Sequence, residues 1–159
     1  MTAATVEGGL GFDVGKASAI YGLYTAIVYM ASLPGGWIAD RFLGQRRAVL
    51  VGGGIMTVGY FLLAAPSMAA FYGGLVLVIT GTGLLKPNIS TIVGQLYAQG
   101  DTRRDAGFSI FYMGVNLGAT LAPLACGVVA RAYGWRAGLA IAGFGMLAGL
   151  IQYSLSGSK

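Results

Sequence analysis

The sequence predicts an all-α integral membrane protein with about five transmembrane helices. Of its 159 residues, 56% are hydrophobic and only 9% are charged, and the mean hydropathy is +0.74. Soluble domains carry roughly 25% charged residues, so this chain has too few charges to cover a surface in water. A lipid bilayer accepts the apolar surface that water would reject.

Charge-free runs along the chain mark the expected spans, because roughly 20 apolar residues in a helix cross a bilayer. The longest run, 48–85, has 38 residues and a turn signal at Ala65-Pro66-Ser67, so it accommodates two passes. Within a transmembrane bundle at 17–155, we expect helices near residues 17–38, 47–65, 70–97, 107–130 and 136–155. We expect an extracytoplasmic loop at 1–16 and a cytoplasmic end at 156–159.

Basic residues in the short loops predict the orientation. Six of them fall on one side of the bundle and three on the other, namely Arg41, Arg46, Arg47, Arg103, Arg104 and Lys159 against Lys16, Arg131 and Arg136. The positive-inside rule places the six-charge side in the cytoplasm. We therefore expect a multi-pass protein of the cell (inner) membrane with its N-terminus outside and its C-terminus cytoplasmic. Since this start carries no signal peptide, we also expect an upstream helix to be missing.

Residue usage argues against several other classes of protein. The net charge of +5 comes from basic residues spread thinly along the chain, so we expect no nucleic-acid partner. The single Cys126 and the absence of histidine leave no metal-ligand cluster and remove the commonest general base. No nucleophile–base pair is visible, so we expect neither an enzyme nor a cofactor.

Lys86 is the most informative residue in the sequence. It is the only charge between Arg47 and Asp101, and it interrupts an apolar helix 11 residues before Tyr97, or about 16 Å from that end at 1.5 Å per residue. That depth is near the midplane of a hydrocarbon core about 30 Å thick. A lysine there costs roughly 2.5–3.5 kcal/mol on insertion scales, so it is expected to face a cavity or a partner rather than lipid.

A bend is predicted beside Lys86. Pro87 lacks a backbone N–H and its ring clashes with the carbonyl of Gly83 in a regular helix. Gly81 and Gly83 add flexibility on the preceding turn. Interrupted helices at the midplane are where transporters place substrate and coupling-ion sites.

Two further helices place polar groups at the depth of Lys86. Tyr29 lies 11 residues before Asp40, and Asn116 lies 11 residues after Asp105, so each is about 16 Å from the same membrane face. Tyr112 is one turn from Asn116 on the same helix face. A single tyrosine or asparagine is explained by packing or an interhelical hydrogen bond. Their common depth favours a shared central cavity.

The loop between the first two helices carries a second candidate motif, GWIADRFLGQRR, at residues 36–47. Positive-inside anchoring explains part of its charge. Asp40 is not needed for anchoring and is expected to accept charge-assisted hydrogen bonds from Arg46, from Arg47 or from a distant helix end, forming a latch.

These segments resemble two levels of family. The 36–47 loop is similar to the loop motif of the major facilitator superfamily, which identifies no substrate. GTGLLKPNIS at 81–90 and DAGFSIFYMGVNLG at 105–118 resemble signatures of the proton-coupled oligopeptide transporters, on that family's fourth and fifth helices. The order and spacing of motifs fit helices two to six, within the N-terminal six-helix bundle of a major facilitator fold.

The resemblance implies a fragment of a symporter that takes up di- and tripeptides with protons, using the proton gradient as its energy source. By position, Lys86 would act in proton coupling and in recognition of the peptide carboxylate. Tyr29, Tyr112 and Asn116 would line the peptide site, and Asp40, Arg41 and Arg46 would belong to the gating motif.

Parts of the family pattern are absent from this sequence, namely the first-helix Glu-x-x-Glu-Arg motif and the second six-helix half. We therefore expect the chain alone not to transport, and its partners to be that missing helix and half, peptide, protons and lipid. Two alternatives stay open. One is a fragment of another major facilitator carrier for sugars, drugs or nitrate, and the other is a small multi-pass channel or scaffold protein.

Overall fold

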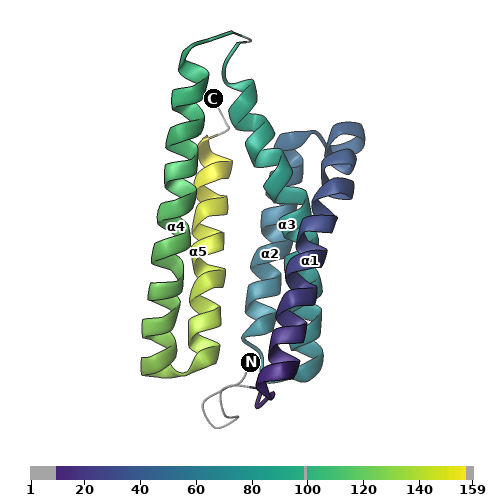
Figure 1. The fold of residues 1–159 in the computed structure, drawn as a ribbon, viewed down its shortest axis with the longest axis vertical. Coiled ribbons are helices and arrows are strands. Elements are labelled where there is room, and N and C mark those ends of the chain that lie inside the picture. Colours follow the sequence, from purple (N-terminus) through teal and green to yellow (C-terminus); the bar gives the residue numbers. More distant parts are fainter. Residues whose placement is uncertain (1–9, 99, 157–159) are drawn as a thin grey trace.

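The computed structural model describes residues 10–98 and 100–156, which form five long antiparallel α-helices joined by short connections (Figure 1). In chain order these are α1 (Val14–Ile38), a π-helical turn η2 (Ala39–Leu43), α2 (Gln45–Leu63), α3 (Met68–Gln95), α4 (Arg103–Tyr133) and α5 (Trp135–Ser156). All five α-helices are long and apolar enough to cross a membrane. The predicted all-α membrane fold with about five spans is confirmed.

Helix ends differ from the predicted bounds where side chains cap them. Asp13 is the N-cap of α1, and its carboxylate accepts a hydrogen bond from the Lys16 backbone N–H at 2.9 Å. This cap satisfies a free amide of the first turn, so α1 begins at Val14 and the prediction of a loop through residue 16 is wrong for 14–16. The rest of that predicted loop at 1–9, and residues 157–159 of the predicted C-terminal end, lie outside the described residues.

Glycine contacts hold α2 and α3 together. A Cβ atom on Gly81 would lie 2.5 Å from the carbonyl oxygen of Gly52, and one on Gly74 would lie 2.9 Å from that of Gly59. Backbones can approach this closely only where there is no side chain, which is how membrane helices gain packing contacts without a hydrophobic driving force. The α2–α3 pair is therefore the centre of the fold, and it includes the fully buried Val78 and Asn88 of α3.

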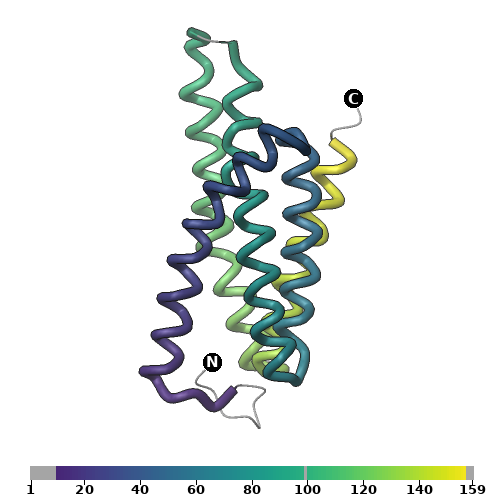
Figure 2. Tube along the Cα trace, turned by 90° about the vertical axis from the view of Figure 1, so that its right-hand side faces the viewer, coloured from purple at the N-terminus to yellow at the C-terminus, as the bar shows by residue number. Residues whose placement is uncertain are grey.

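The other helices flank this pair, so that the contacts run in the order α1, α3, α2, α5, α4 (Figure 2). Helix α1 lies on α3 and α5 lies on α2, where Gly53 faces Leu150 and Met146 of α5. Helix α4 packs mainly on α5, through Ala130 against Gly138. Helices α1 and α4 are the least covered, with only 6% of the most apolar window of each buried, against 33% for α2. Their open surfaces are the ones left for lipid or for further helices.

Candidate functional site

Lys86 and Tyr29 lie in direct contact across the α1–α3 crossing. The Lys86 Nζ atom is 4.1 Å from the centroid of the Tyr29 ring, which is the geometry of a cation–π interaction. Such contacts contribute about 0.5–1 kcal/mol when exposed and about 2 kcal/mol when desolvated. The only ion pair found within the described ranges joins other residues, so the aromatic face is the group that contacts the Lys86 charge there.

Glycines position this contact. A Cβ atom on Gly35 of α1 would collide with the carbonyl group of Gly83 of α3, and one on Gly83 would lie 2.6 Å from the Ala31 carbonyl oxygen. The two backbones therefore touch about one turn from the Lys86–Tyr29 pair. Only glycine at both positions allows this approach, so the sequence sets the distance between the lysine and the aromatic ring.

Helix α3 continues through Pro87 without a break. Pro87 cannot donate to the Gly83 carbonyl, and that carbonyl lies at the α1 crossing instead. On the next turn the buried Asn88 amide donates to the Leu84 carbonyl oxygen at 2.6 Å. Toward its C-terminal end α3 leans toward α4 (Figure 1), where Gly94 lies near Arg104 and Phe108. Gly83 and Pro87 thus lie where α3 changes its neighbours.

Tyr112 and Asn116 lie on α4, away from the Lys86–Tyr29 contact. Both side chains are exposed, and the Tyr112 ring stacks on Phe108 with centroids 6.5 Å apart. Helix α4 has few contacts with α3 and packs mainly on α5. The structure therefore brings together two of the four predicted substrate-binding residues, Lys86 and Tyr29, and leaves the other two without a contact to them.

The predicted latch at the α1–α2 corner has a different partner from the expected one. Asp40 lies in the π-helical turn and accepts a hydrogen bond from the Gln45 side-chain amide at 2.9 Å. Gly44 lies between them with φ of +75°, and this turn of the backbone brings the Gln45 side chain to the Asp40 carboxylate. The expectation that Arg46 or Arg47 binds Asp40 is wrong for this structure, because within the described residues neither arginine forms an ion pair or hydrogen bond with that carboxylate. Arg41 is exposed as well.

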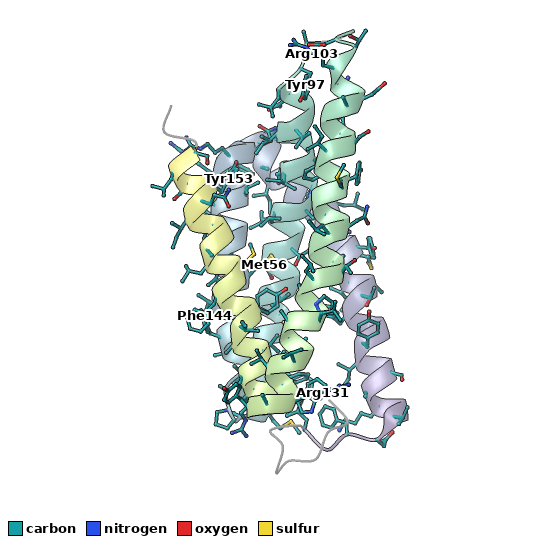
Figure 3. All side chains as sticks on the ribbon, turned by 90° about the vertical axis from the view of Figure 1, so that its left-hand side faces the viewer. Met56, Tyr97, Arg103, Arg131, Phe144 and Tyr153 are labelled. Atoms are coloured by element: carbon teal, nitrogen blue, oxygen red, sulfur yellow. The ribbon has the colours of Figure 1, made fainter. Side chains whose placement is uncertain are left out.

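The second loop on this side contains the one ion pair of the described chain. Arg103 Nη2 lies 2.9 Å from Asp101 Oδ2, and the Arg103 backbone N–H donates to Asp101 Oδ1 at 2.9 Å. These hydrogen bonds, chiefly that of the guanidinium, hold the pKa of the Asp101 carboxyl below its usual value. Asp101, just before the N-cap Thr102, therefore accepts a hydrogen bond from the first backbone amide of α4 as well as pairing charge. Figure 3 shows Arg103 at the opposite end of the bundle from Arg131.

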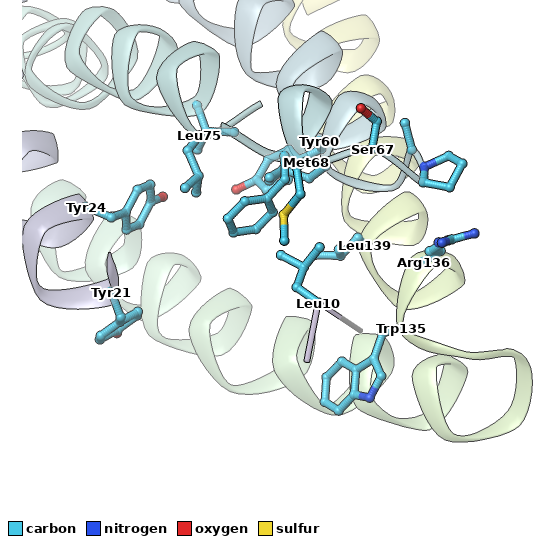
Figure 4. A pocket seen from close by; sticks show the side chains of 15 residues that line it. Leu10, Tyr21, Tyr24, Tyr60, Ser67, Met68, Leu75, Trp135, Arg136 and Leu139 are labelled. Atoms are coloured by element: carbon cyan, nitrogen blue, oxygen red, sulfur yellow. The ribbon is translucent and has the colours of Figure 1, made fainter. Parts of the chain in front are cut away.

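Sequence reasoning missed an apolar cavity at the Arg131 end. It has a volume of about 460 Å³ and lies between α1, the α2–α3 turn and the start of α5 (Figure 4). Tyr24, Tyr60 and Trp135 line it, with Arg136 at its edge. No carboxylate lines it, and no cluster of three or more His, Cys, Asp or Glu side chains occurs in residues 10–98 and 100–156. The aromatic residues were the available signal, but their convergence depends on helix packing.

Five spanning helices, two charged corners at one end and an intramembrane lysine against an aromatic ring define a multi-pass membrane protein of transporter type. A sequence profile described as the POT family matches residues 46–159. The chain belongs to this family, the proton-coupled oligopeptide transporters.

Named relatives share most of this chain. It is 52% identical over 156 residues to "Uncharacterized transporter YclF" of Bacillus subtilis, covering 98% of this chain and 32% of that protein. It is 46% identical over 159 residues to "Peptide transporter YePEPT" of Yersinia enterocolitica, covering 96% of this chain and 30% of that protein. The chain thus spans about a third of the length of these relatives.

Solved structures share the arrangement of the helices. A crystal structure of a peptide transporter POT in complex with sulfate superposes with a TM-score of 0.94 at 48% identity, covering 98% of this chain and 32% of that one. A POT family transporter in complex with a thioalcohol-conjugated peptide gives a TM-score of 0.95 at 42% identity, covering 100% of this chain and 33% of that one.

Proposed function

We propose that this chain supplies helices two to six of a proton-coupled di-/tripeptide symporter. The observation that carries the proposal is the contact of Lys86 with Tyr29 in the middle of the POT signature of α3. Relatives named as peptide and di-/tripeptide transporters support the substrate class. A lysine near the middle of a bilayer costs several kcal/mol unless it faces a cavity or a partner, and the substrate site of a proton-linked carrier provides such a cavity.

In this proposal each predicted residue has a separate role. Lys86 binds the peptide carboxylate and exchanges its proton with carboxylates outside this chain. Tyr29 holds the ammonium group by cation–π contact and lines the peptide site. Tyr112 and Asn116 of α4 face the same site once the remaining helices of the transporter draw α4 toward α3.

The Asp40, Arg41 and Arg46 corner acts as a gate in the same proposal. The Asp40–Gln45 hydrogen bond holds the turn in one conformation, and exposed Arg41 and Arg46 are free to pair with a helix of the second half. Energy comes from the proton gradient, without a cofactor, a metal or an enzymatic step. The chain alone, with about a third of the length of its relatives, is inactive.

A chimera tests this function directly. The segment of the Yersinia transporter that aligns with this chain would be replaced by it, and dipeptide uptake would be measured in proteoliposomes with and without an inward proton gradient. We expect the chimera to take up dipeptide only with the gradient, and other di- and tripeptides to inhibit this uptake. We expect no uptake by the chain alone. Uptake of a sugar, a drug or nitrate instead of peptide would contradict the substrate class, and uptake by the chain alone would contradict its dependence on the missing helices.

The proposed orientation places the α2–α3 turn outside and the α3–α4 loop in the cytoplasm. The three basic residues near the outer face and the larger group at the other end support it. In a Cys126→Ser background, a membrane-impermeant maleimide added to intact cells is expected to label Ser67→Cys and not Thr102→Cys. The reverse labelling would overturn the orientation.

A further inference from the structure

A second cavity lies at the arginine-rich end of the bundle, where α2 begins and α3 and α5 end. Its volume is about 920 Å³, and it opens beside the loop at residues 36–47. Arg46 and Arg47 of α2, Gln95 of α3 and Tyr153 of α5 supply polar groups to its lining. Figure 3 shows Tyr153 near this end of α5. The consecutive helices α2 and α3 and the more distant α5 therefore converge on one polar pocket.

The charge of this pocket is positive and uncompensated. Arg46 and Arg47 are both exposed, and neither belongs to the one ion pair of the described chain, which is Arg103 with Asp101. No carboxylate lines the cavity, and the nearby Asp40 is already bound by Gln45. Two guanidinium groups in one pocket favour a ligand with a phosphate group, because the planar guanidinium donates paired hydrogen bonds to phosphate oxygens.

The remaining wall of the pocket is apolar. Leu50 of α2 and Ile92 of α3 lie about one turn further into the bundle than the arginine-rich end, and Leu96, the C-cap of α3, completes this wall. A free phosphate would leave this wall uncovered. A ligand with an anionic head and a hydrocarbon body matches both parts, and basic pockets between transmembrane helices on the cytoplasmic side are typical sites for acidic lipid head groups.

We propose that this pocket binds an anionic phospholipid of the adjoining leaflet, with its phosphate on Arg46 and Arg47 and its acyl chains along Leu50 and Ile92. The bound lipid joins the ends of α2, α3 and α5 and so stabilises the bundle at the end that carries the loop motif. This site is separate from the Lys86–Tyr29 contact but shares Arg46 with the proposed gate, so it is tested by lipid affinity rather than by transport.

Native mass spectrometry of the full chain in neutral detergent tests the proposal. Phosphatidylglycerol and phosphatidylcholine with the same acyl chains would be titrated against wild type, the double variant R46Q/R47Q and the control R104Q. Arg104 lies at the same end but does not line the cavity. We expect wild type and R104Q to retain phosphatidylglycerol over phosphatidylcholine, and R46Q/R47Q to lose about 30-fold in affinity for it.

A charge-preserving variant and a free anion complete the test. R46K/R47K is expected to keep most of the preference for phosphatidylglycerol, which separates lost charge from lost folding. Inorganic phosphate is expected not to displace the lipid. Equal retention of the two lipids, an equal loss in R104Q, or displacement of phosphatidylglycerol by inorganic phosphate would each overturn the proposal.

Discussion

Adding one methyl group at Gly83 is expected to separate α1 from α3 and destabilise the bundle. The Cβ atom of Gly83→Ala would lie 2.6 Å from the Ala31 carbonyl oxygen and 2.9 Å from the Ala31 Cβ. Real Cβ contacts are essentially never under 3.0 Å, so the helices must move apart by at least 0.4 Å, the difference between 2.6 and 3.0 Å. The obstacle is backbone, which no change of rotamer relieves.

The expected cost follows from overpacking, which destabilises a packed interior by about 1–3 kcal/mol. For a chain of this size, 1 kcal/mol corresponds to about 2–4 °C in the unfolding midpoint, so Gly83→Ala is expected to lower Tm by about 2–12 °C. Thermal unfolding in detergent, followed by tryptophan fluorescence and circular dichroism, measures this shift.

Gly22→Ala is the matched control, because a Cβ on Gly22 of α1 meets nothing within 4 Å. Alanine there is expected to raise stability by about 0.5–1 kcal/mol through its higher helix propensity. The two substitutions add the same methyl group and are predicted to shift Tm in opposite directions. If Gly83→Ala were as stable as Gly22→Ala, the close α1–α3 crossing would be refuted.

Three further predictions concern the membrane site and the loops. Tyr29→Leu removes the ring under the Lys86 ammonium and is expected to lower the free energy of unfolding by about 0.5–2 kcal/mol. Tyr29→Phe keeps the ring and is expected to stay near wild type in the same thermal assay. Equal losses in the two variants would contradict a cation–π contact. Because the pKa of Asp101 is lowered in the folded chain, its contribution to the start of α4 is present above the ordinary carboxyl pKa and is lost as pH falls through the lowered value. Amide hydrogen exchange in the first turn of α4 is expected to be slower in wild type than in Asp101→Asn until the pH falls below the lowered pKa of Asp101. Below that pH the two exchange rates are expected to be equal, and a rate difference that persists there would contradict the pairing. Gly44→Ala is expected to lower the free energy of unfolding by about 1–2 kcal/mol because φ is +75° there. Gly54→Ala is expected to cause no such loss, because a Cβ atom on Gly54 of α2 meets nothing within 4 Å. Equal Tm values for the two variants would argue against the left-handed turn.

Much of the fold could be predicted from the sequence because the bilayer imposes a simple rule. Each span needs about 20 apolar residues in a helix, and the charge-free runs supplied them. The predicted ends were less accurate, since they depend on single hydrogen bonds. The Asp13 side chain caps α1, which therefore begins at Val14. The Asp101 side chain accepts a hydrogen bond from the Arg103 backbone N–H, and α4 begins at Arg103, four residues earlier than expected.

The helix contacts could not be predicted, because the chain has 28 glycines and spacing does not distinguish among them. The spaced pair Gly114 and Gly118 meets nothing within 4 Å, whereas Gly52 meets Gly81. Which glycines touch is set by the crossing of helices far apart in sequence. Asp40 is a similar case, since the reversal at Gly44 selects Gln45 as its partner over the neighbouring arginines.

The candidate site was partly accessible to sequence reasoning. A lone charge in an apolar span predicts a functional lysine from energetics alone, and equal depth along helices of known length predicted a plane that includes Tyr29. The contact of Lys86 with the Tyr29 ring depends on the Gly35–Gly83 crossing, which no local pattern reveals. The position of Tyr112 and Asn116 could not be predicted, because α4 packs mainly on α5 and has few contacts with α3.

The most direct test of the proposed function compares two lysine variants in the Yersinia chimera. Initial rates of proton-driven dipeptide uptake would be measured for Lys86→Ala and for Lys16→Ala, which removes an equal charge at the exposed start of α1. We predict that Lys86→Ala abolishes gradient-driven uptake and that Lys16→Ala retains it. Uptake at the unmodified rate in Lys86→Ala, with the protein correctly inserted, would contradict the role of this lysine in proton-coupled peptide transport.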